Sequence, residues 1–345
     1  MKGKYGSTAD KALDSYDDDE ASPILANGFG SNSYDSNDYS RIGAFMIFFF
    51  PALGGLLFGY DIGGTSAVVS QLKSADYSGV SWYSNVADSS VLQGVITSIG
   101  MFGAMLGSMT CFSIADELGR RRSLLLASFL FVFGSLFEAF SGKSTYSARN
   151  GIILLLTGRL IYGYGCGFAM HGAPAYIGEM SPPAIRGLLV SLKEAFIVLG
   201  MVLGYSIGYA YADTVGGWRY TYFWSCPFAI AMFCGMSYLP YSARWLALKG
   251  RVLEARESLR FVLPNLPESE AEAMQEVANK AAEAQEQNKS MAGDWKRLTS
   301  PTILPAMVAG VGLVFLQQVT GQPSVLYYAD SIFEDVGLVT HSLTH

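Results

Sequence analysis

The chain has 345 residues, of which 50% are hydrophobic, 15% are charged and 38 are glycine, and its formal net charge is −6. Soluble domains carry about 25% charged residues, so this composition excludes an ordinary soluble domain, and we expect no nucleic-acid partner. The four cysteines lie in apolar runs without C-x-x-C spacing, and the chain has three histidines. This pattern argues against a disulfide framework and against a metal site.

The N-terminal residues 1–40 are polar and acidic, a composition typical of disordered segments. We expect an acidic cytoplasmic tail there and no cleavable signal peptide. Within the tail, Ile24 and Leu25 follow Glu20 in the spacing of an acidic dileucine sorting signal. This match favours an internal vacuolar membrane, with the plasma membrane as the alternative.

Seven apolar runs follow, each long enough for a helix to cross ~30 Å of hydrocarbon. They lie at 42–69, 91–115, 123–141, 151–176, 187–211, 220–240 and 302–329. Glycines lie mostly inside these runs, where they let the backbones of packed membrane helices approach each other. The sequence therefore predicts an integral membrane protein.

The organisation of these runs predicts four regions. After the tail, residues 41–240 form a six-helix transmembrane bundle, and residues 241–300 form a connector. The connector is rich in helix formers, which predicts short cytoplasmic helices. Residues 301–345 hold one further transmembrane helix. This layout matches the major facilitator fold, with its 3+3 repeats nested in each six-helix half, so we expect an all-α membrane protein in which five of twelve spans are missing.

Lysines and arginines beside the spans predict the orientation. The short loops on the two sides carry equal numbers of them. Arg41 and the cations that flank spans six and seven break the tie, and they place the N-terminus and the connector in the cytoplasm.

The turn between spans two and three combines a glycine with several charges. Guanidinium groups at a cytoplasmic membrane face can hold carboxylates on neighbouring helix ends, although a plain positively charged loop is the alternative. We expect a cytoplasmic gate that latches the outward-open state, formed by Asp116, Arg120, Arg121, Arg122, Glu179 and Arg186.

Asp61 lies within the first predicted span. An ionised carboxylate in a bilayer costs several kcal/mol unless it is paired or hydrated, so it marks a candidate functional site. Arg159, within span four, is its natural partner. The alternative is a carboxylate that reaches the headgroups at the outer end of span one.

These motifs together resemble the sugar porter family of the major facilitator superfamily. The matching elements are D-x-x-G-R-R at 116–121, Gly158-Arg159, G-x-G-x-G at 163–167, P-x-Y-x-x-E at 174–179, Arg186-Gly187 and Q-Q-x-x-G at 317–321. The run from 171 to 220 is most similar to plant-type vacuolar or plastidic glucose transporters of the xylose–proton symporter-like type. The resemblance covers about residues 42–329 and implies an outward- and inward-opening sugar carrier.

The resemblance also implies roles for single residues. Asp61 opposite Arg159 is typical of proton-coupled members. The sugar-binding positions correspond to Phe58, Glu194, Gln317, Gln318 and Tyr327.

Four positions depart from the family pattern, and one of them is Ala243, which stands where the family's P-E-S-P-R-W motif has its second proline. Glu194 replaces a glutamine, and Pro323 replaces an asparagine. For the Lys193–Glu194 pair, a pair of charges at a helix end is the alternative. Tyr241 stands where the family's P-E-S-P-R-W motif has a glutamate, so any ion pair made by that glutamate is absent here.

We therefore predict transport of a hexose or pentose by proton symport and alternating access. The proton is the coupling ion, and we expect no cofactor, no metal and no enzymatic activity. The partners are a monosaccharide and the lipid bilayer, and the protein is a monomer or loose oligomer. The alternatives are an uncoupled facilitator and a transport-inactive sensor or regulatory fragment. The second follows from the end of the chain after span seven, from which we expect that residues 1–345 alone transport nothing.

Overall fold

The computed structural model describes residues 39–143, 147–264 and 304–329, together with positions 279, 332 and 336. The predicted tail, the sorting signal and most of the connector lie outside these residues. The described helices are α3 Arg41–Lys73, α4 Tyr83–Ala87, α5 Ser90–Leu118, α6 Arg120–Phe140, α7 Ala148–Met180, α8 Pro183–Ala210, α9 Trp218–Phe223, α10 Ser225–Tyr238, α11 Ala243–Leu248, α12 Val252–Arg260, α15 Leu304–Val319 and α16 Gln322–Tyr327.

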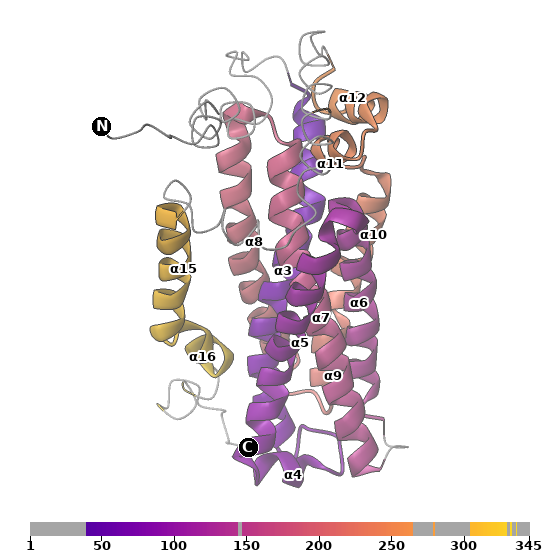
Figure 1. The fold of residues 1–345 in the computed structure, drawn as a ribbon. Coiled ribbons are helices and arrows are strands. Elements are labelled where there is room, and N and C mark those ends of the chain that lie inside the picture. The colour runs from indigo at the N-terminus through magenta and orange to yellow at the C-terminus, as the bar shows by residue number, and fades with distance from the viewer. Residues whose placement is uncertain are drawn as a thin grey trace, which may run out of the picture.

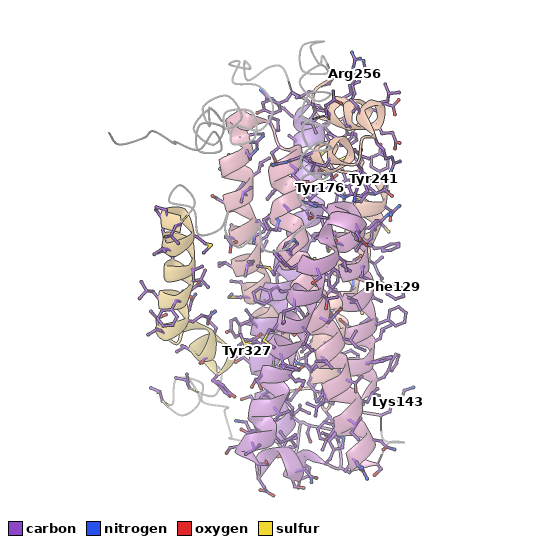
Figure 2. The ribbon with its side chains drawn as sticks, in the orientation of Figure 1. Phe129, Lys143, Tyr176, Tyr241, Arg256 and Tyr327 are labelled. Atoms are coloured by element: carbon purple, nitrogen blue, oxygen red, sulfur yellow. The ribbon has the colours of Figure 1, made fainter. Side chains whose placement is uncertain are left out.

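Five of these helices, α3, α5, α6, α7 and α8, are long and apolar enough to cross a membrane. They coincide with the first five predicted spans and stand side by side as an upright bundle (Figure 1). Their outer faces carry exposed aromatic side chains such as Phe129, which points away from the bundle (Figure 2). Such faces are compatible with contact to lipid tails.

The sixth predicted span is divided into two consecutive helices. α9 and α10 meet at Trp224, which has φ −64° and ψ −15° and keeps the chain direction helical. Pro227 has no N–H to bond the carbonyl of residue 223, and this loss interrupts the helical hydrogen-bond ladder. Residues 218–238 still extend about 31 Å at 1.5 Å per residue.

The seventh predicted span is also divided. α15 ends at Val319, and Gly321 has φ +71°, a left-handed conformation that ends the helix before α16 begins. α15 lies at the side of the bundle beyond α8, while α16 turns back toward it (Figure 1). α16 packs against α3.

Glycines set the closest helix crossings. α3 packs along α8, and a Cβ on Gly59 or Gly200 would overlap the carbonyl oxygen of Ile197 or Leu56 on the opposite helix. α5 packs along α7 in the same way, where a Cβ on Gly163 would overlap the carbonyl oxygen of Gly100. These two pairs of helices therefore touch backbone to backbone, as small residues allow in membranes.

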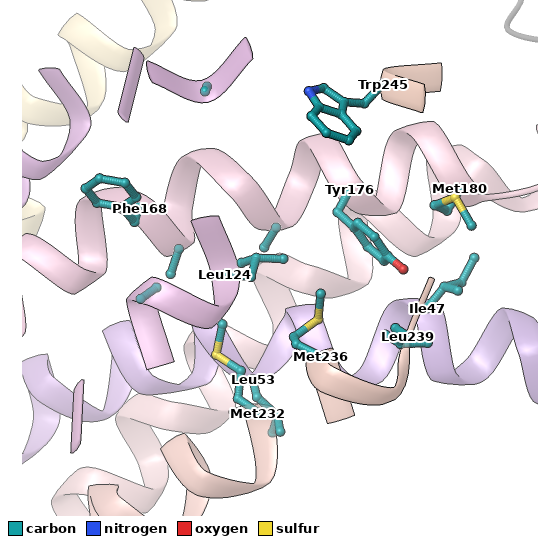
Figure 3. Packing of buried hydrophobic residues seen from close by; sticks show 14 of the residues in the cluster. Ile47, Leu53, Leu124, Phe168, Tyr176, Met180, Met232, Met236, Leu239 and Trp245 are labelled. Carbon is teal, nitrogen blue, oxygen red and sulfur yellow. The ribbon is translucent and has the colours of Figure 1, made fainter. Parts of the chain in front are cut away.

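The main apolar core lies toward the end of the bundle that carries α11 and α12, which we call the α11 end. Met232, Met236 and Leu239 lie beside Leu53 and Ile47 of α3 (Figure 3). The core continues onto α11 through Trp245. The first helices of the predicted connector are thus packed onto the bundle and are not a free linker.

Candidate functional site

A buried ion pair joins α3 to α7. Arg159 donates a hydrogen bond from Nη1 to Oδ1 of Asp61, and the two side chains are 0% and 7% exposed. The structure therefore brings together the two charged residues that the sequence analysis paired. Asp61 is not a surface carboxylate at the end of its helix.

Neighbouring helices shape the space around this pair. Arg159 also donates from Nε to the Ile96 carbonyl at 3.2 Å, and a Cβ on Gly100 would lie 2.9 Å from its Nη2. Thr65, one turn after Asp61, donates to Oδ1 at 3.5 Å. The guanidinium lies 5.8 Å from the ring centroid of Tyr222, which favours a cation in this position.

Glu138 of α6 adds a second carboxylate that the sequence analysis did not identify. Its Oε1 lies 3.9 Å from Nη1 of Arg159, and its side chain is 1% exposed. The signal was present in the sequence, because Glu138 lies inside the third predicted span just as Asp61 lies inside the first. The three residues Asp61, Glu138 and Arg159 form what we call the buried charge cluster.

The predicted sugar-binding residue Glu194 lies in the middle of α8. It is paired with Lys193 at 2.7 Å, and the lysine side chain is 5% exposed whereas the glutamate is 66% exposed. Lys193 packs over Gly55 of α3, so the pair is anchored to the bundle on the lysine side. Both residues lie about 15 Å along α8, away from either helix end. Phe58 is half-buried against the main core.

Tyr327, on α16, is a predicted sugar-binding residue from the seventh span that reaches the bundle. It is buried and close enough to Asp61 and Arg159 for their charges to act on its hydroxyl, and its side chain extends toward the long helices (Figure 2). The Tyr205 hydroxyl holds α16 by donating to the Leu326 carbonyl at 2.5 Å.

Gln317 and Gln318 lie on α15 and are exposed. Gln317 donates to the Gln322 side chain at 3.0 Å. The structure thus does not join the two glutamines to Glu194.

The predicted gate residues gather at the α11 end. Arg120 donates to Glu179 of α7 at 3.0 Å and to Asp116 at 3.2 Å. Ser242, at the start of α11, donates to the other oxygen of Glu179, and Trp245 donates from Nε1 to the Asp116 carbonyl at 2.9 Å. Arg120 and Glu179 therefore tie the α5–α6 turn to α7 and α11.

The other three gate arginines differ from the prediction, because they contact carbonyls and rings. Arg121 donates to the carbonyls of Met236 and Ser237 at 3.0 and 2.5 Å, and Arg186 donates to the Ser181 carbonyl at 3.3 Å. Arg122 lies with its guanidinium 5.6 Å from the Tyr241 ring. Helix C-termini present unpaired carbonyls, which attract cations.

Tyr241 occupies the position of the absent glutamate and is contacted by two arginines. The guanidinium carbon of Arg121 lies 4.5 Å from its ring centroid, closer than that of Arg122, and Trp245 stacks on it at 5.8 Å. At the α10–α11 junction the Tyr241 ring thus contacts two arginines. The family's glutamate at this position would instead offer them a carboxylate.

The chain resembles characterised transporters in sequence. Residues 47–345 match the family model described as "Sugar (and other) transporter". D-xylose-proton symporter-like 2 of Arabidopsis thaliana is 46% identical over 310 residues, which cover 87% of this chain and 59% of that protein. The D-xylose transporter of Levilactobacillus brevis is 33% identical over 297 residues, which cover 86% of this chain and 60% of that protein. The chain spans 56–61% of the length of the first three curated relatives it matches.

Solved structures show the same similarity. The MFS (major facilitator superfamily) proton:xylose symporter XylE bound to 6-bromo-6-deoxy-D-glucose gives a TM-score of 0.69 at 28% identity, over 87% of this chain and 64% of that chain. A partially occluded inward-open structure of XylE from E. coli gives 0.64 at 26% identity, over 83% of this chain and 66% of that chain. The predicted all-α membrane protein with the major facilitator fold is thereby confirmed, and the chain belongs to the sugar transporter family.

Proposed function

We propose that the protein moves a hexose or pentose across a membrane together with a proton, by alternating access. Family membership supports sugar transport, and several relatives carry the name xylose–proton symporter or a related one. The observation that carries proton coupling is the buried pair of Asp61 and Arg159. A buried carboxylate between membrane-spanning helices is costly and marks a functional group.

The coupling of proton binding to conformation would depend on the distance between Asp61 and Arg159. Desolvation favours a neutral carboxyl group, whereas a cation in contact favours the ionised form. In the cycle that we propose, Asp61 is ion-paired with Arg159 while the pair is closed, and it takes up the proton when the pair opens. Protonation then depends on conformation, which symport requires.

The sugar would bind on the side of the bundle where Tyr205 of α8 joins α16. Glu194 presents an exposed carboxylate, and Gln317 and Gln318 supply amide donors and acceptors for hydroxyl groups. Phe58 and Tyr327 would offer apolar faces to the sugar C–H groups. In major facilitator transporters the substrate lies between the two six-helix halves near the midplane.

The α11 end is proposed to face the cytoplasm, and the membrane is proposed to be internal or the plasma membrane. Among the described residues, that end carries more cations, as expected for an inner face. It carries Arg41, Arg120, Arg121, Arg122, Arg186, Arg244, Lys249, Arg251, Arg256 and Arg260, while the opposite end carries Lys73, Lys143, Arg149 and Arg219. In Figure 2, Arg256 and Lys143 mark the two ends.

Cysteine labelling tests this orientation. Asp76 and Glu257 are exposed at opposite ends, so Asp76→Cys should react with an impermeant maleimide on intact cells and Glu257→Cys only after permeabilisation. The background Cys234, which is exposed, is first replaced by alanine. Reaction in the reverse order would refute the orientation.

The transport proposal is tested with the product of the full-length transcript in proteoliposomes. We expect xylose or glucose to accumulate against its gradient when an inward proton gradient is imposed. Asp61→Asn should abolish this accumulation and its pH dependence, while sugar exchange between labelled and unlabelled pools continues. Thr65→Val replaces the hydroxyl that donates to Asp61 with a methyl group and keeps the carboxylate, so it serves as the control for loss of that hydrogen bond.

Each rival function has its own outcome in this assay. Equilibration without accumulation in the wild-type protein would indicate an uncoupled facilitator. Sugar binding without uptake or exchange would indicate a sensor.

A further inference from the structure

Glu138 lies near the C-terminal end of α6, where the absence of a side chain at Gly158 of α7 leaves space for it. A Cβ on Gly158 of α7 would lie 2.8 Å from both the Cγ and the backbone nitrogen of Glu138. Glycine at 158, directly before Arg159, therefore lets α6 and α7 approach closely enough to place Glu138 beside the guanidinium. The side chain is 1% exposed, so water does not compensate its charge.

The buried charge cluster contains donors and acceptors that are close but not joined. Within the part of the chain that the structure describes, neither Oε1 nor Oε2 of Glu138 has a hydrogen-bond partner, and neither does Nη2 of Arg159. Nη1 is bonded to Asp61 and lies 3.9 Å from Glu138. A turn of the guanidinium would let Arg159 pair with Glu138 in place of Asp61.

The charge balance of the cluster favours one bound proton. With both carboxylates ionised, one cation faces two anions and a net charge of −1 is buried. With one proton bound, the cluster is neutral. Two carboxylates in one dry site cannot both ionise at low cost, and an uncompensated buried charge is strongly destabilising.

We propose that Glu138 is a second proton-binding carboxylate of the transporter. Arg159 holds one of the two carboxylates ionised, and the exchanged proton is bound to the other. In the arrangement seen here, with Arg159 on Asp61, the proton forms an O–H bond at Glu138. When Arg159 turns to Glu138, that bond breaks and the proton is bound by Asp61.

This inference rests on the proton coupling proposed above. It changes the net charge that is buried when the site binds a proton. With Asp61 and Arg159 alone, binding a proton would take the site from neutral to a buried charge of +1. With Glu138 present, the same step takes it from −1 to neutral. Because of the second carboxylate, the proton-bound site has no net charge and can be buried at low cost.

The titratable groups near Glu138 come from α3, α7, α9 and α10. Asp61 and Arg159 carry the charges, and the remaining titratable neighbours in the described ranges are phenols and thiols. These neighbours are Tyr60 of α3, Tyr162 and Cys166 of α7, Tyr222 of α9 and Cys226 of α10. Among the described residues, Asp61 is the other carboxylate that exerts a charge effect on Glu138.

The transport test compares Glu138→Gln with Ser135→Ala in the full-length protein. Ser135 lies one turn earlier on α6 and is buried against Ser225, so it controls for disturbed packing. Glu138→Gln should keep sugar exchange but lower proton-driven accumulation by about tenfold or more, because loading now leaves a buried cation. Ser135→Ala should behave as wild type. Unchanged accumulation and pH dependence in Glu138→Gln would overturn the proposal.

Infrared difference spectra provide a readout that a structural role would not change. The wild-type protein should show the C=O band of a protonated buried carboxyl group, and Glu138→Gln should lose it. Glu138→Asp keeps an acid in the cluster and should shift the band, which keeps the assignment testable if Glu138→Gln does not fold. A band lost in Asp61→Asn and retained in Glu138→Gln would contradict the proposal.

The two proposals fail in different ways. A wild-type protein that equilibrates sugar without accumulation would refute symport, while the infrared band still decides whether Glu138 binds a proton. A wild-type protein that accumulates sugar, with Glu138→Gln doing the same, would leave symport intact and remove Glu138 from it.

Discussion

Two charged regions of the molecule differ in how much each charge depends on its partner. In the buried charge cluster, Asp61, Glu138 and Arg159 are all less than one-tenth exposed. At the α11 end, Arg120 and Glu179 are 17% and 11% exposed, and Asp116 is 91% exposed. Water and main-chain carbonyls can replace a lost partner at the α11 end but not in the cluster.

This difference predicts a gradient of mutational effects. Removing one partner of a buried ion pair leaves an uncompensated charge, whereas exposed pairs are worth little. The same chemistry, guanidinium against carboxylate, should therefore cost much in the middle of the bundle and progressively less toward its surface.

The largest effect is expected for Arg159→Ala. It leaves two buried carboxylates without a cation, which should destabilise the fold by about 3–5 kcal/mol and abolish transport. Arg159→Lys keeps a charge but not the fork of donors, and should lie between alanine and wild type. Thermal unfolding in detergent measures both. A melting temperature for Arg159→Ala within error of wild type would contradict the buried-cluster argument.

A smaller effect is expected for Arg120→Ala. It removes two charge-assisted contacts in a partly hydrated site and should cost about 1–2 kcal/mol. Because the site is near water, the difference from wild type should shrink as salt is raised, unlike that of Arg159→Ala. Unfolding measured at two salt concentrations tests this contrast, and an equal response of the two variants would remove the distinction between the regions.

Tyr241 should contribute through its ring. Tyr241→Phe keeps the aromatic face under Arg121 and should be close to neutral, whereas Tyr241→Ala should cost about 0.5–1 kcal/mol from lost cation–π contacts, plus packing against Trp245. Chemical unfolding of the two variants compares them directly. Equal losses in both would assign the effect to the hydroxyl group.

The smallest effect is expected for Glu254→Gln on α12. Glu254 pairs with Arg251 at 2.5 Å, and the two side chains are 50% and 46% exposed. Such a pair contributes about 0–0.5 kcal/mol, so stability and uptake should match wild type. A loss above about 1 kcal/mol would show that exposure does not govern these pairs.

The long helices could be predicted from the sequence because a run of apolar residues leaves the backbone few alternatives in a bilayer. The two interrupted helices could not be predicted from run length alone. Pro227 removes one hydrogen bond inside an otherwise apolar run, and Gly321 takes a left-handed conformation that composition does not reveal. Proline positions alone would not have located the breaks either, because α3 and α7 continue through Pro51 and Pro174.

The candidate site could be predicted in part. Asp61 and Arg159 are charges in apolar spans, and the structure places them in contact. Glu138 carried the same signal but belongs to no motif of the resembled family. Its meaning depends on its distance to Arg159, which only the packing of α6 on α7 sets. The ring of Tyr241 as a cation acceptor also required three-dimensional neighbours, because Arg121 is 120 positions away in the chain.

The glycine crossings have a mechanical consequence. At Gly59, Gly200 and Gly163 the space beside the glycine is filled by main-chain atoms of the opposite helix, so sliding or rolling at these crossings would bring main-chain atoms into collision. The pairs α3–α8 and α5–α7 are therefore stiff at these crossings. In the proposed transport cycle, motion would come from each helix pair tilting as a unit and from a few rotatable bonds within it. Rotation of the Arg159 side chain is one such motion, because it requires no change in the helix crossings.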